Sequence, residues 1–143
     1  ALNNDSMADN FADQHRTKLW IAIGREVMGL ATRKGIQPLG FNGFDPIAYL
    51  PGATDSEAQT SVKEMAEFNR MSAKTHSGIW RDLAVRKRKT EVTEQLGILV
   101  ELANEVDFDA PLIKLIIDLI HDVENGQREM SSETFAVLLD RCE

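Results

Sequence analysis

Residues 109–126 read DAPLIKLIIDLIHDVENG, and this stretch decides the fold. Pro111 suits the first turn of a helix, Asp109 is placed to cap that helix, and the closing Asn-Gly pair is a common stop signal. Between these signals the chain is apolar nearly all round from residue 112 to 123. A helix of that kind is buried on most of its sides. The sequence therefore predicts a central helix with the other elements packed around it.

Start and stop signals divide the rest of the chain into further helices. Apolar residues recur at spacings of three and four, and no window alternates as a strand would. We expect helices over about residues 12–34, 54–73, 77–85 and 90–106, a single turn after Asp45-Pro46, and a last helix capped by Ser131 or Ser132. The prediction is an all-α fold, a compact bundle of five or six helices forming one domain over residues 1–143.

Several of these expectations name particular side chains. The first helix should end at a left-handed Gly35, and a capping box should join Thr54 to Glu57. Ser77 is a plausible cap for the third helix. Inward-facing residues are expected to be Leu19, Ile23, Val27 and Leu30 in the first helix, and Val62, Met65, Phe68 or Asn69, and Ser72 in the second.

Composition limits the classes of function. A net charge of −7 argues against a nucleic-acid partner. The longest apolar run is too short and too charged to span a bilayer, and the chain does not open with a secretion signal. Cys142 is the single cysteine, so no internal disulfide or thiolate metal site is possible, and a reducing cytoplasm fits best. The three histidines lie on separate predicted elements, so no metal site is expected.

The segment from residue 76 to 92 is unusual for its chemistry. It brings together a hydroxyl (Ser77), a flexible glycine (Gly78), five basic side chains (Arg81 and residues 86–89) and a carboxylate (Glu91). One interpretation is structural, with Ser77 and Thr90 as helix caps, Glu91 as a complement to a helix dipole and the basic tract as a solvated loop. The other is functional, with Arg81, Arg86 or Arg88 attracting an anion near a helix start. Both remain open.

This segment resembles the C-terminal helical domain of ketopantoate reductases (2-dehydropantoate 2-reductases). The family pattern runs from an aspartate through a short basic turn to Thr-Glu, then to a glycine, an Ala-containing helix and a proline. The matching residues here are Asp82, Thr90, Glu91, Val92, Gly97, Ala103 and Pro111. Glu26-Val27 and Gly35-Ile36 also look like family positions, so the resemblance covers about residues 12–120. The distance from Asp82 to Glu91 is about one residue longer than in well-known members.

The resemblance implies a fold like the C-terminal domain of 6-phosphogluconate-dehydrogenase-like reductases. It also implies an NADP-dependent oxidoreductase that reduces a 2-keto acid such as ketopantoate to the 2-hydroxy acid in pantothenate biosynthesis. In such enzymes an N-terminal Rossmann domain binds most of the NADP, the helical domain closes over it, and the enzyme can be a homodimer. That Rossmann domain is absent from this chain, which is expected to be inactive alone.

The resemblance also implies roles for individual residues. Glu91 would contact the cofactor ribose. The substrate-binding serine of the family falls at Gly78, with Ser77 beside it, so either position could serve the substrate. The general-acid lysine of the family lies upstream of Ala1, so no catalytic residue is assigned here. The alternative is a non-enzymatic helical protein-interaction module, whose apolar fifth helix would pack against a partner or against itself.

Overall fold

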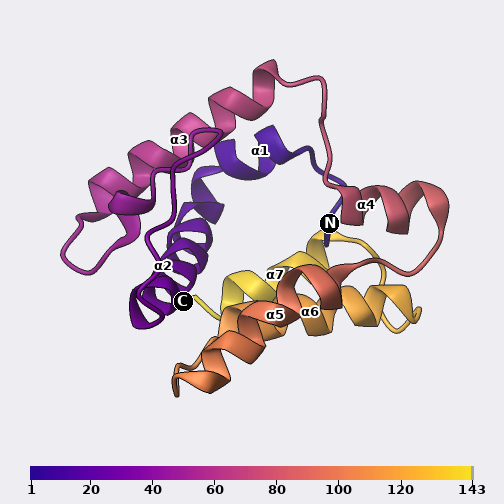
Figure 1. Cartoon of the computed structure of the whole chain (residues 1–143). Coiled ribbons are helices and arrows are strands. Elements are labelled where there is room, and N and C mark those ends of the chain that lie inside the picture. The colour runs from indigo at the N-terminus through magenta and orange to yellow at the C-terminus, as the bar shows by residue number, and fades with distance from the viewer. Residues whose placement is uncertain (143) are drawn as a thin grey trace. The chain divides into compact units, whose positions relative to one another are not determined.

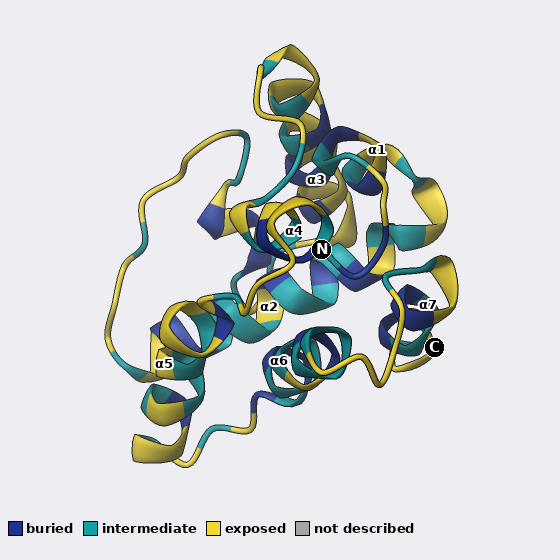
Figure 2. Cartoon of the chain, turned by 90° about the vertical axis from the view of Figure 1, so that its right-hand side faces the viewer, coloured by how far each residue is buried: buried dark blue, intermediate teal, exposed yellow. Residues whose placement is uncertain are grey.

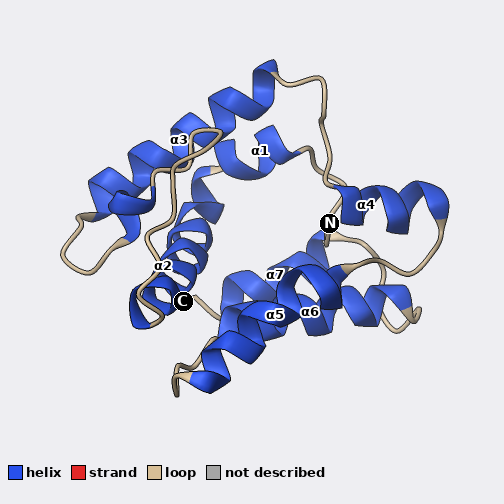
Figure 3. Ribbon diagram, in the orientation of Figure 1, coloured by secondary structure: helices blue, strands red, loops and turns tan. Residues whose placement is uncertain are grey.

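The computed structural model describes residues 1–142, and over these residues the chain is all-α (Figure 3). The described part contains seven α-helices and no strand, with one isolated bridge between Phe41 and Phe44. The all-α prediction is confirmed. The predicted count of five or six helices was too low, because a short helix, α1 (Met7–Ala12), precedes the long first one.

The chain divides into two compact units, which are described separately. The first, called the α1–α3 unit, comprises Ser6–Thr75. The second, called the α4–α7 unit, comprises Ala1–Asp5 together with the chain from His76 onward. The single domain expected over residues 1–143 stays a prediction.

The α1–α3 unit begins with two helices separated by a tight turn (Figure 1). The Asp13 carboxylate accepts a hydrogen bond from the His15 N–H at 2.9 Å and starts a 3₁₀ turn, Gln14–Arg16. Helix α2 (Thr17–Arg33) therefore begins about five residues later than predicted. It ends as expected, with Gly35 in the left-handed region at φ +67°.

A long connection leads from α2 to α3 (Asp55–Met71) and contains the 3₁₀ turn Pro46–Tyr49, which Asp45 caps as predicted. At the start of α3 the predicted capping box is confirmed. The Thr54 hydroxyl accepts from the Glu57 N–H, and a Glu57 carboxylate oxygen accepts from the Thr54 N–H at 2.7 Å.

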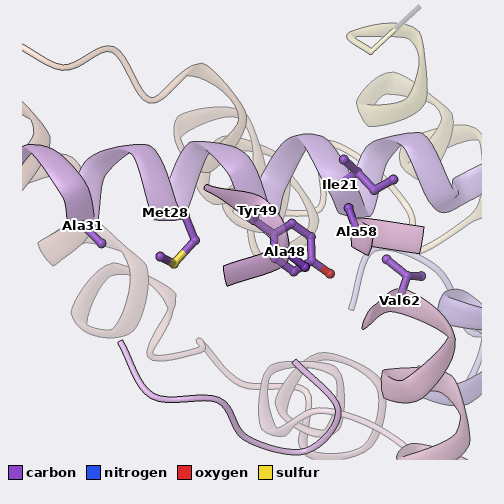
Figure 4. Close-up of a cluster of buried hydrophobic side chains, with 7 residues drawn as sticks. All are labelled: Ile21, Met28, Ala31, Ala48, Tyr49, Ala58 and Val62. Atoms are coloured by element: carbon purple, nitrogen blue, oxygen red, sulfur yellow. The ribbon is translucent and has the colours of Figure 1, made fainter. Parts of the chain in front are cut away.

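The core of the α1–α3 unit forms where α2, the 3₁₀ turn and α3 meet (Figure 4). Tyr49 is 1% exposed and stacks on Phe44, with 4.9 Å between ring centroids. A Cβ added at Gly24 would lie 2.4 Å from the Tyr49 ring, so only a glycine lets the ring approach α2 this closely. The seven buried apolar residues of this core are Ile21, Met28, Ala31, Ala48, Tyr49, Ala58 and Val62.

This packing corrects part of the predicted inner faces. Ile23 and Val27 are only half-buried, since the face of α2 toward Tyr49 is made by Ile21, Gly24 and Met28. In α3 the small residues supply the buried face. Of the alternatives Phe68 and Asn69, Phe68 is exposed and Asn69 is half-buried, as is Ser72. Four predictions hold, because Leu19, Leu30 and Val62 are buried and Met65 packs against the core.

The α4–α7 unit contains α4 (Gly78–Arg81), a π-helical turn (Asp82–Arg86), α5 (Val92–Glu105), α6 (Pro111–Glu124) and α7 (Ser132–Asp140). Helix α6 packs against α5 on one side and α7 on the other, as Figures 1 and 2 both show. The beginning of the chain joins this unit, where the Leu2 carbonyl accepts from the Ser131 N–H at 3.0 Å. The expectation of a central helix at 111–124 is confirmed within this unit.

The two ends of α6 test the start and stop residues that the sequence predicted for this helix. Pro111 is its first residue, and Asn125 and a left-handed Gly126 close it, as predicted. The expected Asp109 cap was wrong. Ala110 occupies the cap position without a side-chain bond, and the Asp109 carboxylate pairs instead with Lys114 Nζ at 3.1 Å. At α7 the predicted Ser131 cap is confirmed, because its hydroxyl accepts from the Thr134 N–H.

Candidate functional site

Ser77 and Gly78 form the start of α4. The Ser77 hydroxyl oxygen accepts a hydrogen bond from the Trp80 N–H at 3.0 Å, so the predicted cap is confirmed. Within residues 1–142 the hydroxyl proton of Ser77 has no acceptor, which leaves it able to donate to a ligand. Gly78 is exposed, and a Cβ built on it would meet nothing within 4 Å. The backbone at position 78 would therefore accept a serine.

Aromatic stacking fixes the other side of α4. The rings of His76 and Trp80 stack with centroids 3.9 Å apart, and His76 Nε2 lies 3.3 Å from the Asn4 carbonyl oxygen. The Trp80 indole Nε1 is buried, and no partner for it lies among the described residues. These contacts attach the short helix to the beginning of the chain.

Asp82 is the centre of the basic segment. The residue is 7% exposed, and one carboxylate oxygen accepts from an Arg86 guanidinium nitrogen and from Arg88 Nε, both at 2.9 Å. The hydrogen bond from Arg86, followed by that from Arg88, holds the pKa of the Asp82 carboxyl below its usual value. Two of the cations proposed to attract an anion are therefore engaged by this carboxylate.

The backbone after Asp82 is a π-helical turn. It covers Asp82–Arg86 and ends at Lys87, which adopts the left-handed region at φ +52°. A π turn bonds residue i to i+5, so it holds one residue more than an α turn. The resemblance implies about one residue more between Asp82 and Glu91 than in well-known members, and a π turn has room for it. The sequence pattern carries no signal for a π turn, and residues 82–85 were expected to continue the predicted α-helix over 77–85.

The remaining cations of the segment are Arg81, Lys87 and Lys89. All three side chains are exposed, and none forms an ion pair with another residue in the described part of the chain. Arg81, Lys87 and Lys89 are thus unpaired within residues 1–142, and the exposed guanidinium groups of Arg86 and Arg88 keep further N–H donors that an external anion could use.

Glu91 occupies the cap position of α5 but makes no capping bond. Its side chain is exposed, and its one hydrogen bond is a long one, 3.4 Å from Gln95 Nε2. An ionised carboxylate can accept several hydrogen bonds, and ribose hydroxyls can donate them. Glu91 therefore fits the role of a ribose-binding residue, which stays a prediction.

The backbone that carries Glu91 is tied to the end of α6. Thr90 donates from its N–H and from its hydroxyl to the same oxygen of Glu124, and the Thr93 hydroxyl lies 3.0 Å from His121 Nε2. The expectation that Thr90 opens the helix was wrong by two residues, because α5 begins at Val92. Thr90 accepts from the Val92 N–H while it holds Glu124.

All predicted site residues lie in the α4–α7 unit. Ser77 and Gly78 open α4, Glu91 precedes α5, and the Asp82 hydrogen bonds to Arg86 and Arg88 lie in the segment between these two helices. Among residues 1–142, no group of three histidine, cysteine or acidic side chains could hold a metal ion. Over the same residues, no helix has the length and apolar character needed to cross a bilayer.

Comparison with known proteins gives one match. The family model described as "Ketopantoate reductase PanE/ApbA C terminal" matches residues 1–124. The matched region extends from the beginning of the chain to the last residue of α6 and includes Ser77, Gly78 and Glu91. Neither the curated proteins nor the solved structures contain a match to the chain.

Proposed function

Because the chain belongs to the ketopantoate reductase family and corresponds to its C-terminal domain, we propose that it forms the helical half of an NADP-dependent reductase. The substrate would be a 2-keto acid such as ketopantoate, and the product the 2-hydroxy acid. A Rossmann domain would bind most of the nucleotide, and the enzyme would be a cytoplasmic homodimer. The family match supports a reductase reaction. The Rossmann domain, the homodimer and the cytoplasmic location are part of what we propose.

The exposed carboxylate of Glu91 is the observation that carries this proposal. Its hydrogen-bonding capacity is almost unused, and Thr90 holds the backbone beside it through Glu124. A carboxylate on a backbone held in this way can accept hydrogen bonds from ribose hydroxyls, and only its own side chain has to be ordered on binding. Glu91 would thus orient the nucleotide, while the helical half excludes water from the substrate.

The chemistry divides between the cofactor and the protein. When bound, the nicotinamide cofactor supplies a hydride to the carbonyl carbon of the keto acid. The Ser77 hydroxyl, which has a free proton, would donate a hydrogen bond to the substrate carboxylate or carbonyl oxygen. The proton that completes the hydroxyl would come from a general acid outside this chain, and residues 1–143 alone would show no turnover.

The alternative of an interaction module rests on the apolar faces of the fifth predicted helix. The fifth predicted helix, α6, packs between α5 and α7, and its only exposed residue is the charged Asp118. An interaction module would have to use the half-buried Leu115, Ile116 and Ile117 of α6 as its contact surface. The reductase proposal is the one that the family match and the site support together.

The test is the affinity of the full-length protein for NADPH. Glu91→Ala removes charge-assisted hydrogen bonds, so we expect the Kd to rise about tenfold or more. Glu94→Ala is the matched control, because it removes an exposed carboxylate from the same helix. If both variants bind NADPH with unchanged Kd, Glu91 does not contact the cofactor and the proposal loses its main support.

A further inference from the structure

Charge is segregated within the α4–α7 unit. Residues 81–89 carry five basic side chains and one acidic side chain, a net charge of +4. The rest of the unit carries three basic and fourteen acidic side chains, a net charge of −11. One short segment therefore holds the excess positive charge of an otherwise acidic unit. An acidic surrounding repels large polyanions, so a small anion is the ligand that this segment suits.

The shape of the segment is set by Asp82. Its carboxylate holds Arg86 and Arg88, and its carbonyl accepts from the Arg88 N–H at 3.1 Å. Between these two arginines the backbone at Lys87 is in the left-handed region. Lys87 and Lys89 alternate with the engaged arginines, and they stay exposed and unpaired among the described residues. Two free ammonium groups are thus presented by an internally bonded turn.

Glu91 follows Lys89 by two residues. In any nucleotide the 5′-phosphate is one methylene group away from the ribose, so a ribose-binding residue has a phosphate close by. Lysine ammonium groups bind phosphate as point charges and do not need the planar geometry of arginine. The order of charges along the chain, two cations and then a carboxylate, fits the order phosphate and then ribose.

We propose that Lys87 and Lys89 bind a phosphate group of the nucleotide cofactor whose ribose Glu91 binds. This inference rests on the proposed function, since it takes a nucleotide to be the ligand. It adds that the helical half contributes directly to phosphate binding. The phosphate belongs either to the pyrophosphate, which NADPH and NADH share, or to the 2′-phosphate, which only NADPH has.

The experiment compares Kd values for NADPH and NADH in the full-length protein. The variant is K87N/K89Q, because asparagine tolerates the left-handed backbone at position 87 and neither replacement is charged. The matched control, K18Q/K74Q, removes two exposed lysines of the α1–α3 unit. Far-UV circular dichroism and the urea midpoint verify folding of both variants.

We expect K87N/K89Q to weaken NADPH binding on the order of tenfold, and the control to leave it unchanged. If the affinity for NADH falls by the same factor, the lysines bind the pyrophosphate. If the Kd for NADH is unchanged, they bind the 2′-phosphate. Inorganic pyrophosphate should compete with the nucleotide less well in the variant if the first assignment holds.

Two results overturn the inference and leave the function standing. One is an unchanged NADPH Kd in K87N/K89Q together with a raised Kd in Glu91→Ala. The other is a raised KM for the keto acid alone, which would give the lysines to the substrate carboxylate. An unchanged Kd in both K87N/K89Q and Glu91→Ala instead removes the support for the proposed function as well.

Discussion

Thr90 donates two hydrogen bonds to a single carboxylate oxygen of Glu124, one from its N–H at 2.7 Å and one from its hydroxyl. Glu124 is the last residue of α6, where a negative charge opposes the helix dipole. The two donors from Thr90 offset that unfavourable position. The same bonds attach the end of the basic segment to α6, so they serve both stability and the placement of Glu91.

Removing the Thr90 hydroxyl should therefore destabilise the α4–α7 unit. We expect Thr90→Val to lower the free energy of unfolding by about 1–2 kcal/mol, because Glu124 keeps one donor in a part-buried site. Thr93→Val removes the exposed contact to His121 and should cost less than about 0.5 kcal/mol. Urea denaturation measures both, and an equal cost for the two variants would contradict the role given to Thr90.

Two glycines should respond in opposite ways to alanine. Gly24→Ala places a methyl group 2.4 Å from the Tyr49 ring and should cost about 1–3 kcal/mol. Gly78→Ala meets nothing within 4 Å and should be neutral or stabilising by up to about 1 kcal/mol. Thermal unfolding measures both, and a destabilised Gly78→Ala would show that position 78 is constrained.

Replacement of Ser77 tests the substrate role separately from the cap. Aspartate and asparagine both cap helices, so Ser77→Asp and Ser77→Asn should leave the unfolding midpoint nearly unchanged. Ser77→Asp places a negative charge where the keto acid carboxylate would bind, and we expect KM to rise about tenfold in the full-length protein. Ser77→Asn should raise KM less. Equal KM values in both variants would indicate that the substrate carboxylate binds elsewhere.

Acid should weaken the α4–α7 unit through Asp82. Its pKa is lower in the folded protein than in the unfolded chain, so its contribution to stability is fully present above the unfolded value of about 3.9. That contribution is lost as the pH falls through the lower, folded value. Asp82→Asn should therefore destabilise the protein at pH 7, and this effect should shrink progressively as the pH falls below about 3.9.

Urea midpoints at several pH values measure this dependence. Asp109→Asn is the control, since its exposed carboxylate pairs with Lys114 on the surface and should contribute little at any pH. A destabilisation by Asp82→Asn that is independent of pH would mean that the carboxylate charge does not hold Arg86 and Arg88.

Signals confined to a few residues predicted much of this fold. The caps at Thr54, Ser77 and Ser131 form because a hydroxyl and a backbone N–H three residues later meet in any helix start. Pro111 and Gly126 mark α6 for similarly local reasons. The resemblance to a family also came from a continuous pattern, and the match over residues 1–124 confirms it.

Features that depend on contacts distant in the sequence were missed. The burial of Ile21 instead of Ile23 follows from Tyr49, which lies on another element. The role of Thr90 depends on Glu124, 34 residues away. The ion pairs of Arg86 and Arg88 with Asp82 are local, at four and six residues, and were missed because no spacing rule reveals that Asp82 is buried. The roles of Glu91, Ser77 and Gly78 stay predictions.

The π turn at Asp82–Arg86 has a consequence for how such sequences diverge. One residue inserted into an α-helix rotates everything beyond it by about 100°. A π turn holds one added residue within its own length, and residues 87–91 separate it from α5. In an alignment of family members, a single-residue gap within residues 82–86 would then mark a change of helix type and not a change of loop length.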